Sequence, residues 1–320
     1  MTSQSIAGQP AANAPPADFD AYWGELLDEL ATQPIAAEET ELPLRSDEET
    51  TCYTVKLSGW GNYRLFGYLS IPKKGNGPFP AYYYLPRHMS VMEVVNQGES
   101  VHKRRDCITF SIACRGQRNA DEPLIGRFPG MLTDGVEDRQ TYPMRGWVAD
   151  CVRGLEYLLS RPEVDADHIA GVGYSDIALL AAALKPALCC VTAIPGSFYR
   201  TRELHHGCHG YPIEEVNDYV RCYPDRAETL YETFSYFDPR WFADKIDIPC
   251  LLWGEPPMSY LPTDELKPLA EAIGPNAEIH ASEQSRSLDG IVQEHWLADH
   301  LGLKSPVLPQ VWAVPVESEG

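Results

Sequence analysis

The sequence has no apolar run approaching the roughly 20 residues that a membrane-spanning helix needs. Basic side chains are also scarce, because 26 Lys and Arg residues stand against 46 Asp and Glu and leave a formal net charge of -20. A charge of this sign repels polyanions at neutral pH, so nucleic acids and anionic membranes are not expected partners. The 320 residues are otherwise 44% hydrophobic and 22% charged, which is typical of a globular chain with one large core.

Signals for export and for disulfide bonding are absent as well. Residues 1–17 have neither the basic start nor the apolar stretch of a secretory signal, and we expect them to form a disordered lead. Nine scattered cysteines, an odd number that includes the adjacent Cys189 and Cys190, fit reduced thiols better than a disulfide framework. These features predict a cytoplasmic protein. We expect residues 18–305 to form a single domain and residues 306–320 a C-terminal tail.

Hydrophobic periodicity predicts an α/β domain. Asp18 or Asp20 can cap an amphipathic helix, and the alternation in residues 53–57 and 63–71 predicts an antiparallel hairpin. A further helix is expected after Pro143. Short apolar runs, typical of buried parallel strands, occur at residues 81–85, 107–112, 169–174, 189–194 and 249–253.

An aromatic-rich segment, residues 197–245, interrupts this alternation of strands and helices. We expect it to form an insertion over the carboxyl edge of the sheet, which is where open α/β sheets bind ligands.

The segment Gly173-Tyr174-Ser175-Asp176-Ile177 resembles the G-x-S-x-G motif of serine hydrolases. In that motif the serine lies on a sharp turn between a strand and a helix, and the residue two positions later must be small for the turn to close. Ile177 is not small. The pattern therefore predicts a serine in the position of a nucleophile, and it leaves open whether catalysis is retained, altered or lost.

Several further motifs resemble the acetyl xylan esterase and cephalosporin C deacetylase family of α/β-hydrolases. They are Asp18-Phe19-Asp20-Ala21-Tyr22-Trp23, the hairpin around Gly67, Arg115-Gly116-Gln117, residues 130–135, Ser160-Arg161-Pro162-Glu163-Val164-Asp165, residues 211–216 and Trp296. The resemblance implies an α/β-hydrolase fold, with a mostly parallel central sheet, helices on both faces and antiparallel strands at the N-terminal side. It also implies hydrolysis of small acyl esters without a cofactor, and a homo-oligomer whose sites face an inner space.

The same resemblance shows where this chain departs from the family's pattern. The family's elbow reads Ser-Gln-Gly-Gly, whereas this chain has Ser175-Asp176-Ile177-Ala178. A His-Gly-Tyr loop that supplies an oxyanion contact corresponds to Pro86-Arg87-His88, and proline has no amide hydrogen to donate. The position of the catalytic aspartate holds Pro257, two residues after Glu255, and the position of the catalytic histidine holds Asp289.

These departures remove the base that the family would provide. A serine hydroxyl is a poor nucleophile without a neighbouring base, and the loss of the base from a triad lowers the rate by a factor on the order of 10⁶. Two histidines could replace it. His295 lies beside Trp296, and His88 lies in the loop after the strand next to the nucleophile strand.

Acidic residues offer a different site at the same sheet edge. Asp176, Glu255 and Asp289 would gather near Ser175, and crowded carboxylates raise one another's pKa, which can create a general acid or base. The alternative is that they fill an inactive pocket. Candidates for substrate contacts are Arg87, Tyr84, Tyr174 and Gln117.

Two other features have structural interpretations. In the family that this chain resembles, the arginine at the position of Arg115 binds a buried carboxylate, and we expect the same here. The tract His205-His206-Gly207-Cys208-His209 contains zinc-type ligands, but adjacent histidines on a turn point in different directions, so we expect no metal site.

Three functions are consistent with these observations, each with a small molecule as the partner. The first is an esterase with a relocated base, whose activity depends on Ser175. The second is a non-hydrolytic enzyme of the lyase, cyclase or isomerase type, whose activity survives the loss of Ser175 and depends on His88, Asp176 or Asp289. The third is a catalytically inactive subunit or binding protein.

Overall fold

The computed structural model describes residues 14–88, 104–117, 120–124, 126–256 and 258–309. Within these residues the strands form a single mixed sheet of nine strands in the order β1-β2-β3-β5-β4-β6-β7-β8-β9. The strands are β1 (Glu38–Glu41), β2 (Thr50–Ser58), β3 (Arg64–Pro72), β4 (Phe79–Tyr84), β5 (Ile108–Ala113), β6 (Val164–Val172), β7 (Cys190–Ala193), β8 (Cys250–Gly254) and β9 (Ala277–Ala281). Strands β1, β2, β3 and β5 pair antiparallel, and every pair from β5 through β4 to β9 is parallel.

This arrangement confirms the predicted antiparallel hairpin followed by a parallel sheet. The five apolar runs correspond to β4, β5, β6, β7 and β8. Strand β6 begins earlier than its apolar run, at Val164, and ends at Val172 because the chain turns at Gly173. Two edge strands, β1 and β9, have no continuous apolar signal in the sequence, since every residue of β1 is exposed and none of β9 is buried.

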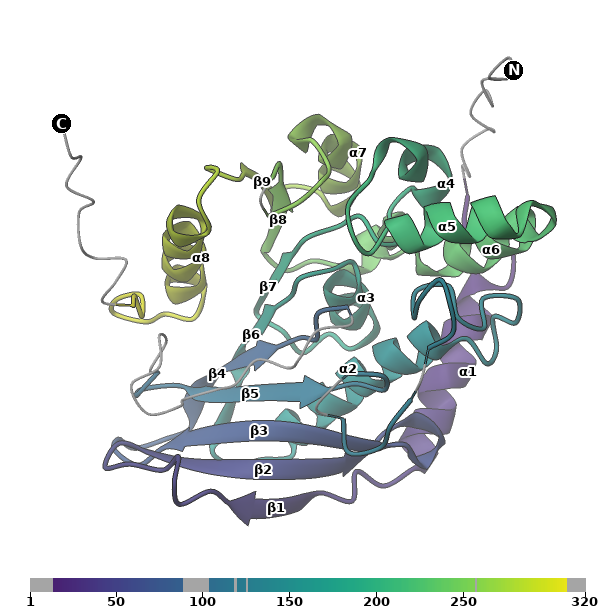
Figure 1. The fold of residues 1–320 in the computed structure, drawn as a ribbon. Coiled ribbons are helices and arrows are strands. Elements are labelled where there is room, and N and C mark those ends of the chain that lie inside the picture. The colour runs from purple at the N-terminus through teal and green to yellow at the C-terminus, as the bar shows by residue number, and fades with distance from the viewer. Residues whose placement is uncertain (1–13, 89–103, 118–119, 125, 257, 310–320) are drawn as a thin grey trace.

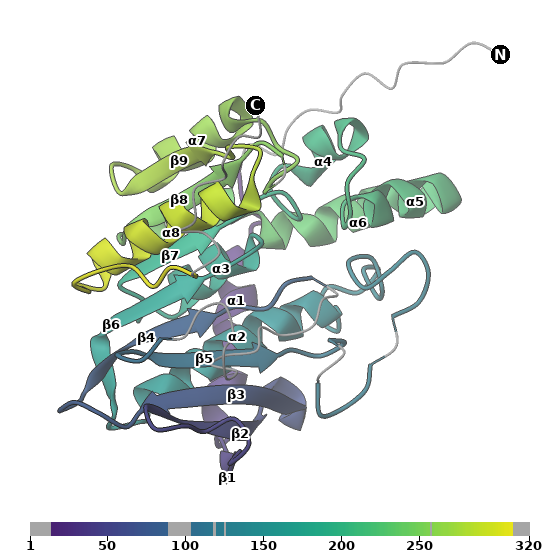
Figure 2. The ribbon, with the colours of Figure 1, turned by 60° about the vertical axis from the view of Figure 1, so that its left-hand side comes forward.

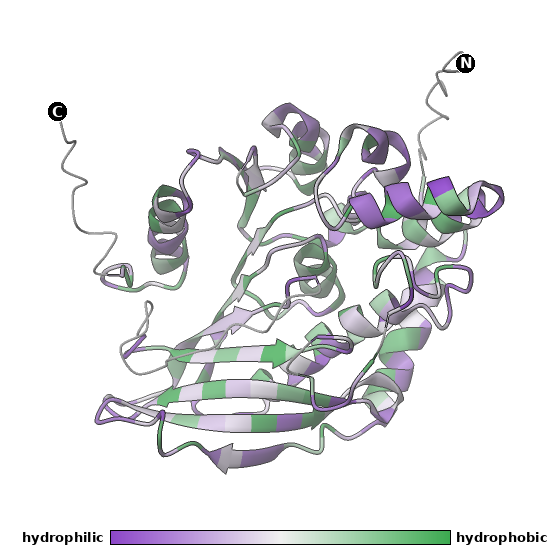
Figure 3. Ribbon diagram, viewed as in Figure 1, coloured by the Kyte–Doolittle hydropathy of each residue, from purple (hydrophilic) through white to green (hydrophobic). Residues whose placement is uncertain are grey.

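Helices cover both faces of the sheet. They are α1 (Phe19–Thr32), α2 (Pro143–Leu159), α3 (Ile177–Leu184), α4 (Thr201–Leu204), α5 (Glu214–Cys222), α6 (Ala227–Phe234), α7 (Thr263–Ile273) and α8 (Arg286–His300). Helices α1, α2 and α3 pack on one face, and α8 packs on the other (Figures 1 and 2). Helix α3 is hydrophobic along its length, in agreement with the burial of residues 177–183 (Figure 3).

Helices α1 and α2 form as their periodicity predicts. In α1, Phe19, Trp23 and Leu26 are buried on one side. Asp18 occupies the predicted cap position, but its carboxylate makes no capping hydrogen bond and instead accepts one from Arg139. Helix α2 begins with Pro143, whose missing N–H costs nothing in the first turn.

Residues 197–245 contain α4, α5 and α6 together with short 3₁₀ segments at His205–Gly207, Pro224–Arg226, Ser235–Phe237 and Pro239–Lys245. Both ribbon views place α5 and α6 on the side toward which β5 points (Figures 1 and 2). The insertion therefore lies at the carboxyl ends of the parallel strands, beside the turn that carries Ser175.

Gly173 makes that turn possible. Its N–H donates to Thr192 O at 3.0 Å, and a Cβ atom at this position would lie 2.8 Å from the same oxygen and 2.2 Å from the Cβ of Ala178. Neither neighbour can move without shifting β7 or α3. The turn from β6 into α3 can therefore close only on a residue without a side chain.

We predict that Gly173→Ala lowers the free energy of unfolding by about 3 kcal/mol, because the added methyl overpacks this junction. Gly24→Ala is the matched control, since nothing lies within 4 Å of a Cβ added at that position of α1. It should stabilise the protein by up to about 1 kcal/mol through helix propensity. Urea titrations of both variants measure the change in the free energy of unfolding. Equal changes would show that the neighbours of Gly173 move aside without cost and would contradict the prediction.

Candidate active site

Ser175 lies between the end of β6 and the first residue of α3, with 6% of its surface exposed. Within the described residues, its hydroxyl makes no hydrogen bond to an imidazole or to any other group. A strained turn often places its residue in a sparsely populated backbone region such as the left-handed one. Ser175 is not among the non-glycine residues with positive φ, which in the described chain are Ala36, Asn62, Arg200, Glu255 and Gln284.

The residues on either side of this serine are used for packing and for anchoring a loop. The carboxylate of Asp176 is fully buried and accepts hydrogen bonds from the backbone N–H groups of Gly196, Ser197 and Phe198 at 3.0, 2.6 and 2.9 Å. Burial raises the pKa of Asp176 to about 6, while the three N–H donors act in the opposite direction. Ile177 is 2% exposed and packs in the main hydrophobic core.

The loop after β4 lies against the turn. The guanidinium carbon of Arg87 is 3.6 Å from the centre of the Tyr174 ring, which is the geometry of a cation–π contact. The amide nitrogen of Gln117 donates to Arg87 O at 3.0 Å, and its oxygen accepts from Cys114 N at 2.7 Å. The structure thus connects Arg87, Tyr174 and Gln117, three of the four residues that the sequence suggested as substrate contacts.

His88 pairs with a residue of the insertion. Its Nε2 lies 3.2 Å from Oε1 of Glu215 on α5, and the two side chains are 8% and 5% exposed. The centre of the imidazole lies 6.0 Å from the ring centre of Trp147 and 5.7 Å from that of Tyr211. Its Nδ1 is buried and has no hydrogen-bond partner among the described residues.

Sequence reasoning did not assign a role to Glu215. The two partners lie 127 residues apart, and no periodicity connects them. The available signal was a glutamate inside residues 211–216, a segment that also carries the family resemblance.

Tyr84, the fourth suggested contact residue, faces the side of the sheet that α8 covers. Its hydroxyl accepts from Nε of Arg104 at 3.1 Å. The guanidinium of Arg104 also makes two hydrogen bonds to Glu294 of α8, at 2.8 and 2.6 Å, and lies 3.5 Å from the centre of the Tyr82 ring. This buried ion pair fixes α8 to the sheet.

Two further acidic candidates are each bonded near the start of a helix. Oε1 of Glu255 accepts from Thr263 N at 3.0 Å, in the first turn of α7. Asp289 is fully buried and accepts from Ser282 Oγ at 2.6 Å and from Glu283 N at 2.8 Å. The structure connects neither carboxylate to Ser175 by a hydrogen bond. Pro257 lies outside the described residues, and His295 is exposed on α8.

The prediction for Arg115 is confirmed. Its Nε and Nη2 donate to the two oxygens of Asp150 at 2.9 and 2.8 Å, and Asp150 is completely buried. This bidentate pair joins the end of β5 to α2. A buried charge without its partner is strongly destabilising, so the pair is a structural element of this edge.

The histidine tract of the insertion forms a hydrogen-bond network. His205 is 1% exposed, and its ring nitrogens lie 2.8 Å from Asn217 Oδ1 and 2.6 Å from Tyr231 Oη. Burial lowers the pKa of His205 to about 4, so the ring is neutral at pH 7. Among the described residues, no group of three or more His, Cys, Asp or Glu side chains could hold a metal ion.

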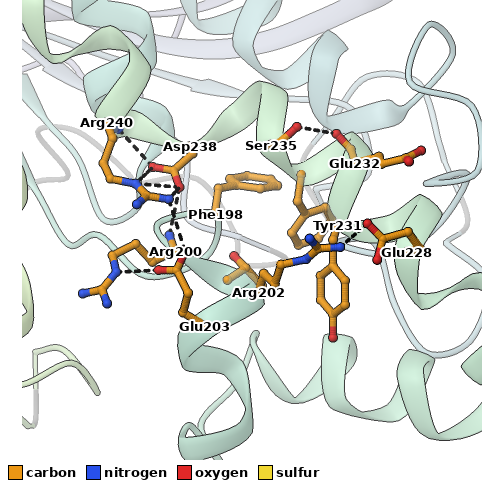
Figure 4. A pocket seen from close by; sticks show the side chains of 12 residues that line it. Phe198, Arg200, Arg202, Glu203, Glu228, Tyr231, Glu232, Ser235, Asp238 and Arg240 are labelled. Atoms are coloured by element: carbon orange, nitrogen blue, oxygen red, sulfur yellow. Dashed lines mark hydrogen bonds and ion pairs between the residues drawn. The ribbon is translucent and has the colours of Figure 1, made fainter. Parts of the chain in front are cut away.

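A cavity of about 160 Å³ lies in the insertion, between α4 and α6 (Figure 4). Three arginines line it, and each is paired with an acid. Arg240 binds Asp238, Arg202 binds Glu228, and Arg200 binds Glu203. With Glu232, the lining has four acidic side chains against three arginines, so it does not form an anion site.

Comparisons with known proteins place this geometry in a class. The acetyl xylan esterase from Paenibacillus sp. R4 is 20% identical, with a TM-score of 0.74 over 91% of this chain and 96% of that chain. Acetyl xylan esterase 1 from Thermoanaerobacterium sp. JW/SL YS485 is 21% identical, with a TM-score of 0.73 over 92% and 96%. These similarities, together with the sheet topology, define an α/β-hydrolase fold. None of the helices in the described parts of the chain has the length and apolar character required to cross a membrane.

The model of the acetyl xylan esterase (AXE1) family matches residues 4–254. The chain belongs to this family. A curated relative, the acetyl esterase Axe7A of Xylanibacter ruminicola, is 27% identical over 254 residues, which cover 75% of this chain. The match spans 56% of the length of that relative.

The low pKa of His205 gives a testable pH dependence. The unfolded chain binds a proton near pH 6.5, whereas the folded protein binds it only near pH 4. The contribution of neutral His205 to stability is therefore complete above pH 6.5 and decreases as the pH falls toward 4. The total loss is about 3 kcal/mol.

We expect His205→Gln to remove this loss, as measured by urea unfolding at pH 4.5 and pH 7. The raised pKa of Asp176 makes the free energy of unfolding increase as the pH falls over a similar range. The effect of His205 is therefore measured as the difference between the variant and the wild-type protein at each pH. His209→Gln, at a side chain that is 79% exposed, should retain the wild-type dependence. Equal pH dependence in all three proteins would contradict the assignment.

Proposed function

We propose that this chain acts on a small acyl ester-like molecule with a non-standard, incomplete Ser-His-Asp triad. Membership of the acetyl xylan esterase family and the resemblance to an acetyl esterase support the substrate class. One observation carries the proposal about the triad. The hydroxyl of Ser175, at the position of the nucleophile, has no imidazole within hydrogen-bond distance among the described residues.

The chemistry of the hydroxyl explains the consequence. Nucleophilic attack by serine requires a base that removes the proton during the reaction. Asp176, which follows the serine, already accepts three backbone hydrogen bonds, and Asp289 accepts two. In the described residues neither carboxylate is hydrogen-bonded to the hydroxyl of Ser175, so neither is placed to take its proton. Ser175 therefore keeps its proton at neutral pH.

The surroundings of Ser175 support a small substrate. Arg87 makes a cation–π contact with Tyr174, the residue before Ser175, and Tyr211 of the insertion packs near His88 in the loop after β4. The faces of aromatic rings and guanidinium groups can contact organic groups that carry no charge, so the substrate need not be an ion. The predicted homo-oligomer and the predicted cytoplasmic location remain expectations from the sequence.

The proposal predicts slow hydrolysis of p-nitrophenyl acetate, with kcat/KM well below the range of about 10⁴ to 10⁸ M⁻¹s⁻¹ that is common for enzymes. Ser175→Ala should change kcat/KM by less than about threefold, because an unactivated hydroxyl contributes little to the rate. A fluorophosphonate probe should leave Ser175 unlabelled in intact-protein mass spectrometry.

Ser287→Ala, at an exposed serine of α8, is the control for the substitution itself. Stoichiometric labelling of Ser175, together with loss of hydrolysis in Ser175→Ala, would identify an ordinary serine esterase and contradict the incomplete triad. Complete absence of ester hydrolysis would contradict the substrate class and favour a non-hydrolytic enzyme or a binding protein.

A further inference from the structure

We infer that His88 and Glu215 form a catalytic dyad in which Nδ1 of His88 is the general base that activates water against the bound ester. The inference rests on the proposed function, because it takes the small acyl ester as the substrate. It assigns the proton transfer to a pair formed between the loop after β4 and helix α5. Ser175 takes no covalent part in this reaction.

The carboxylate of Glu215 is held in one position. Oε1 faces Nε2 of His88 at 3.2 Å, and Oε2 accepts from Leu132 N at 2.7 Å. Gly130 lies against the carboxylate so closely that a Cβ atom there would be 2.2 Å from Cδ of Glu215. Only glycine leaves this space to the acid. Burial and Glu215 together raise the pKa of Tyr211, so this phenol stays protonated beside the carboxylate.

This contact determines which ring nitrogen carries the proton. An ionised carboxylate accepts hydrogen bonds and donates none, so the imidazole proton lies on Nε2 and the lone pair on Nδ1. When Nδ1 takes up a second proton, the adjacent carboxylate stabilises the imidazolium, as the aspartate does in a serine-protease triad. Glu215 is thus the positioning residue, and His88 is the residue that exchanges protons.

The free nitrogen requires an explanation. The His88 side chain is 92% buried, and Nδ1 has no hydrogen-bond partner among the described residues. A buried polar atom without a partner destabilises the fold, and a catalytic role is one reason why native proteins keep one. His88 directly follows Arg87, whose guanidinium lies on the ring of Tyr174 beside Ser175. His88 therefore lies in a loop at the same edge of the sheet as Ser175.

The reaction balances without a covalent intermediate. Nδ1 accepts a proton from water as the water oxygen forms a bond to the ester carbonyl carbon. The bond between that carbon and the alcohol oxygen then breaks, and the departing oxygen takes the proton from Nδ1. The products are a carboxylic acid and an alcohol, and the histidine returns to its starting state. A positioned base of this kind contributes a factor of about 10² to 10⁴ to the rate.

The test measures kcat/KM for p-nitrophenyl acetate from pH 5 to pH 9 in the full-length protein. His88→Gln keeps a donor for Glu215 but removes the base, and it should lower kcat/KM by about 10² to 10⁴. His88→Asn is a second variant in case the first unfolds, as judged by circular dichroism. His168→Gln should retain the wild-type rate, because this half-exposed histidine pairs with Asp165 away from the site.

Glu215→Gln separates a positioning role of this residue from a purely structural one. The groups that face His88 are Glu215 from α5, Tyr211 from the insertion and Trp147 from α2, with Arg87 adjacent in the chain. Glu215 is the only acidic side chain among these four, so Glu215→Gln removes the charge that would stabilise the imidazolium. The acidic limb of the pH–rate profile should shift to lower pH and the maximal rate should fall. A merely structural glutamate would lower the rate without moving the limb.

The outcomes distinguish this inference from the proposed function. Hydrolysis that is lost in Ser175→Ala but retained in His88→Gln would overturn the dyad and leave the ester substrate in place. An acidic limb of the pH–rate profile that does not move in Glu215→Gln would also overturn the dyad. If both His88 variants are unfolded, this measurement is the deciding test. Wild-type protein that hydrolyses no ester would contradict the proposed function itself.

Discussion

The carboxylate of Asp176 is the interaction on which the geometry of the candidate site depends. It is buried directly after Ser175, and three successive N–H groups of residues 196–198 converge on it. A buried carboxylate is tolerated only when its oxygens are satisfied, and these bonds do so. They also join the β6 turn to the point where the insertion begins. This contact fixes the start of residues 197–245. It thereby helps to set where α5 lies relative to the loop after β4.

The two faces of the sheet have different roles. On one face, α1, α2 and α3 enclose the main core, and Arg115 and Asp150 connect β5 to α2. On the other face, α8 is held by the ion pair of Arg104 and Glu294 above Tyr82. Replacement of such pairs by apolar residues is often neutral in stability, so their benefit lies in fixing one arrangement of the elements. The candidate site lies at the carboxyl edge of the sheet, between these two layers.

Local patterns in the sequence were sufficient for most of the fold. Alternation and apolar runs locate β2 to β8, and the stripe of α2 follows from Trp147 and Leu155. Edge strand β1 could not be found in this way, because the residues of Glu38–Glu41 are all exposed. The partner of Arg115 was anticipated as a buried carboxylate, but its identity as Asp150 depends on how α2 packs.

The site was less predictable for a physical reason. Periodicity reports which residues are buried, but it does not report which polar groups meet. Position 289 could be located by its spacing from Trp296, whereas its bond to Ser282 depends on the loop between β9 and α8. The contact between His88 and Glu215 joins segments 127 residues apart and is visible only after the insertion is placed.

The enclosed position of Asp289 restricts which side chains can replace it. The family resemblance implies a histidine here, but the present side chain is completely buried and is bonded to Ser282 and Glu283. A larger imidazole would have to displace that loop and would leave a buried hydroxyl unpaired. A histidine at this position would therefore need a different path for the loop between β9 and α8, so this loop limits which side chain position 289 can hold.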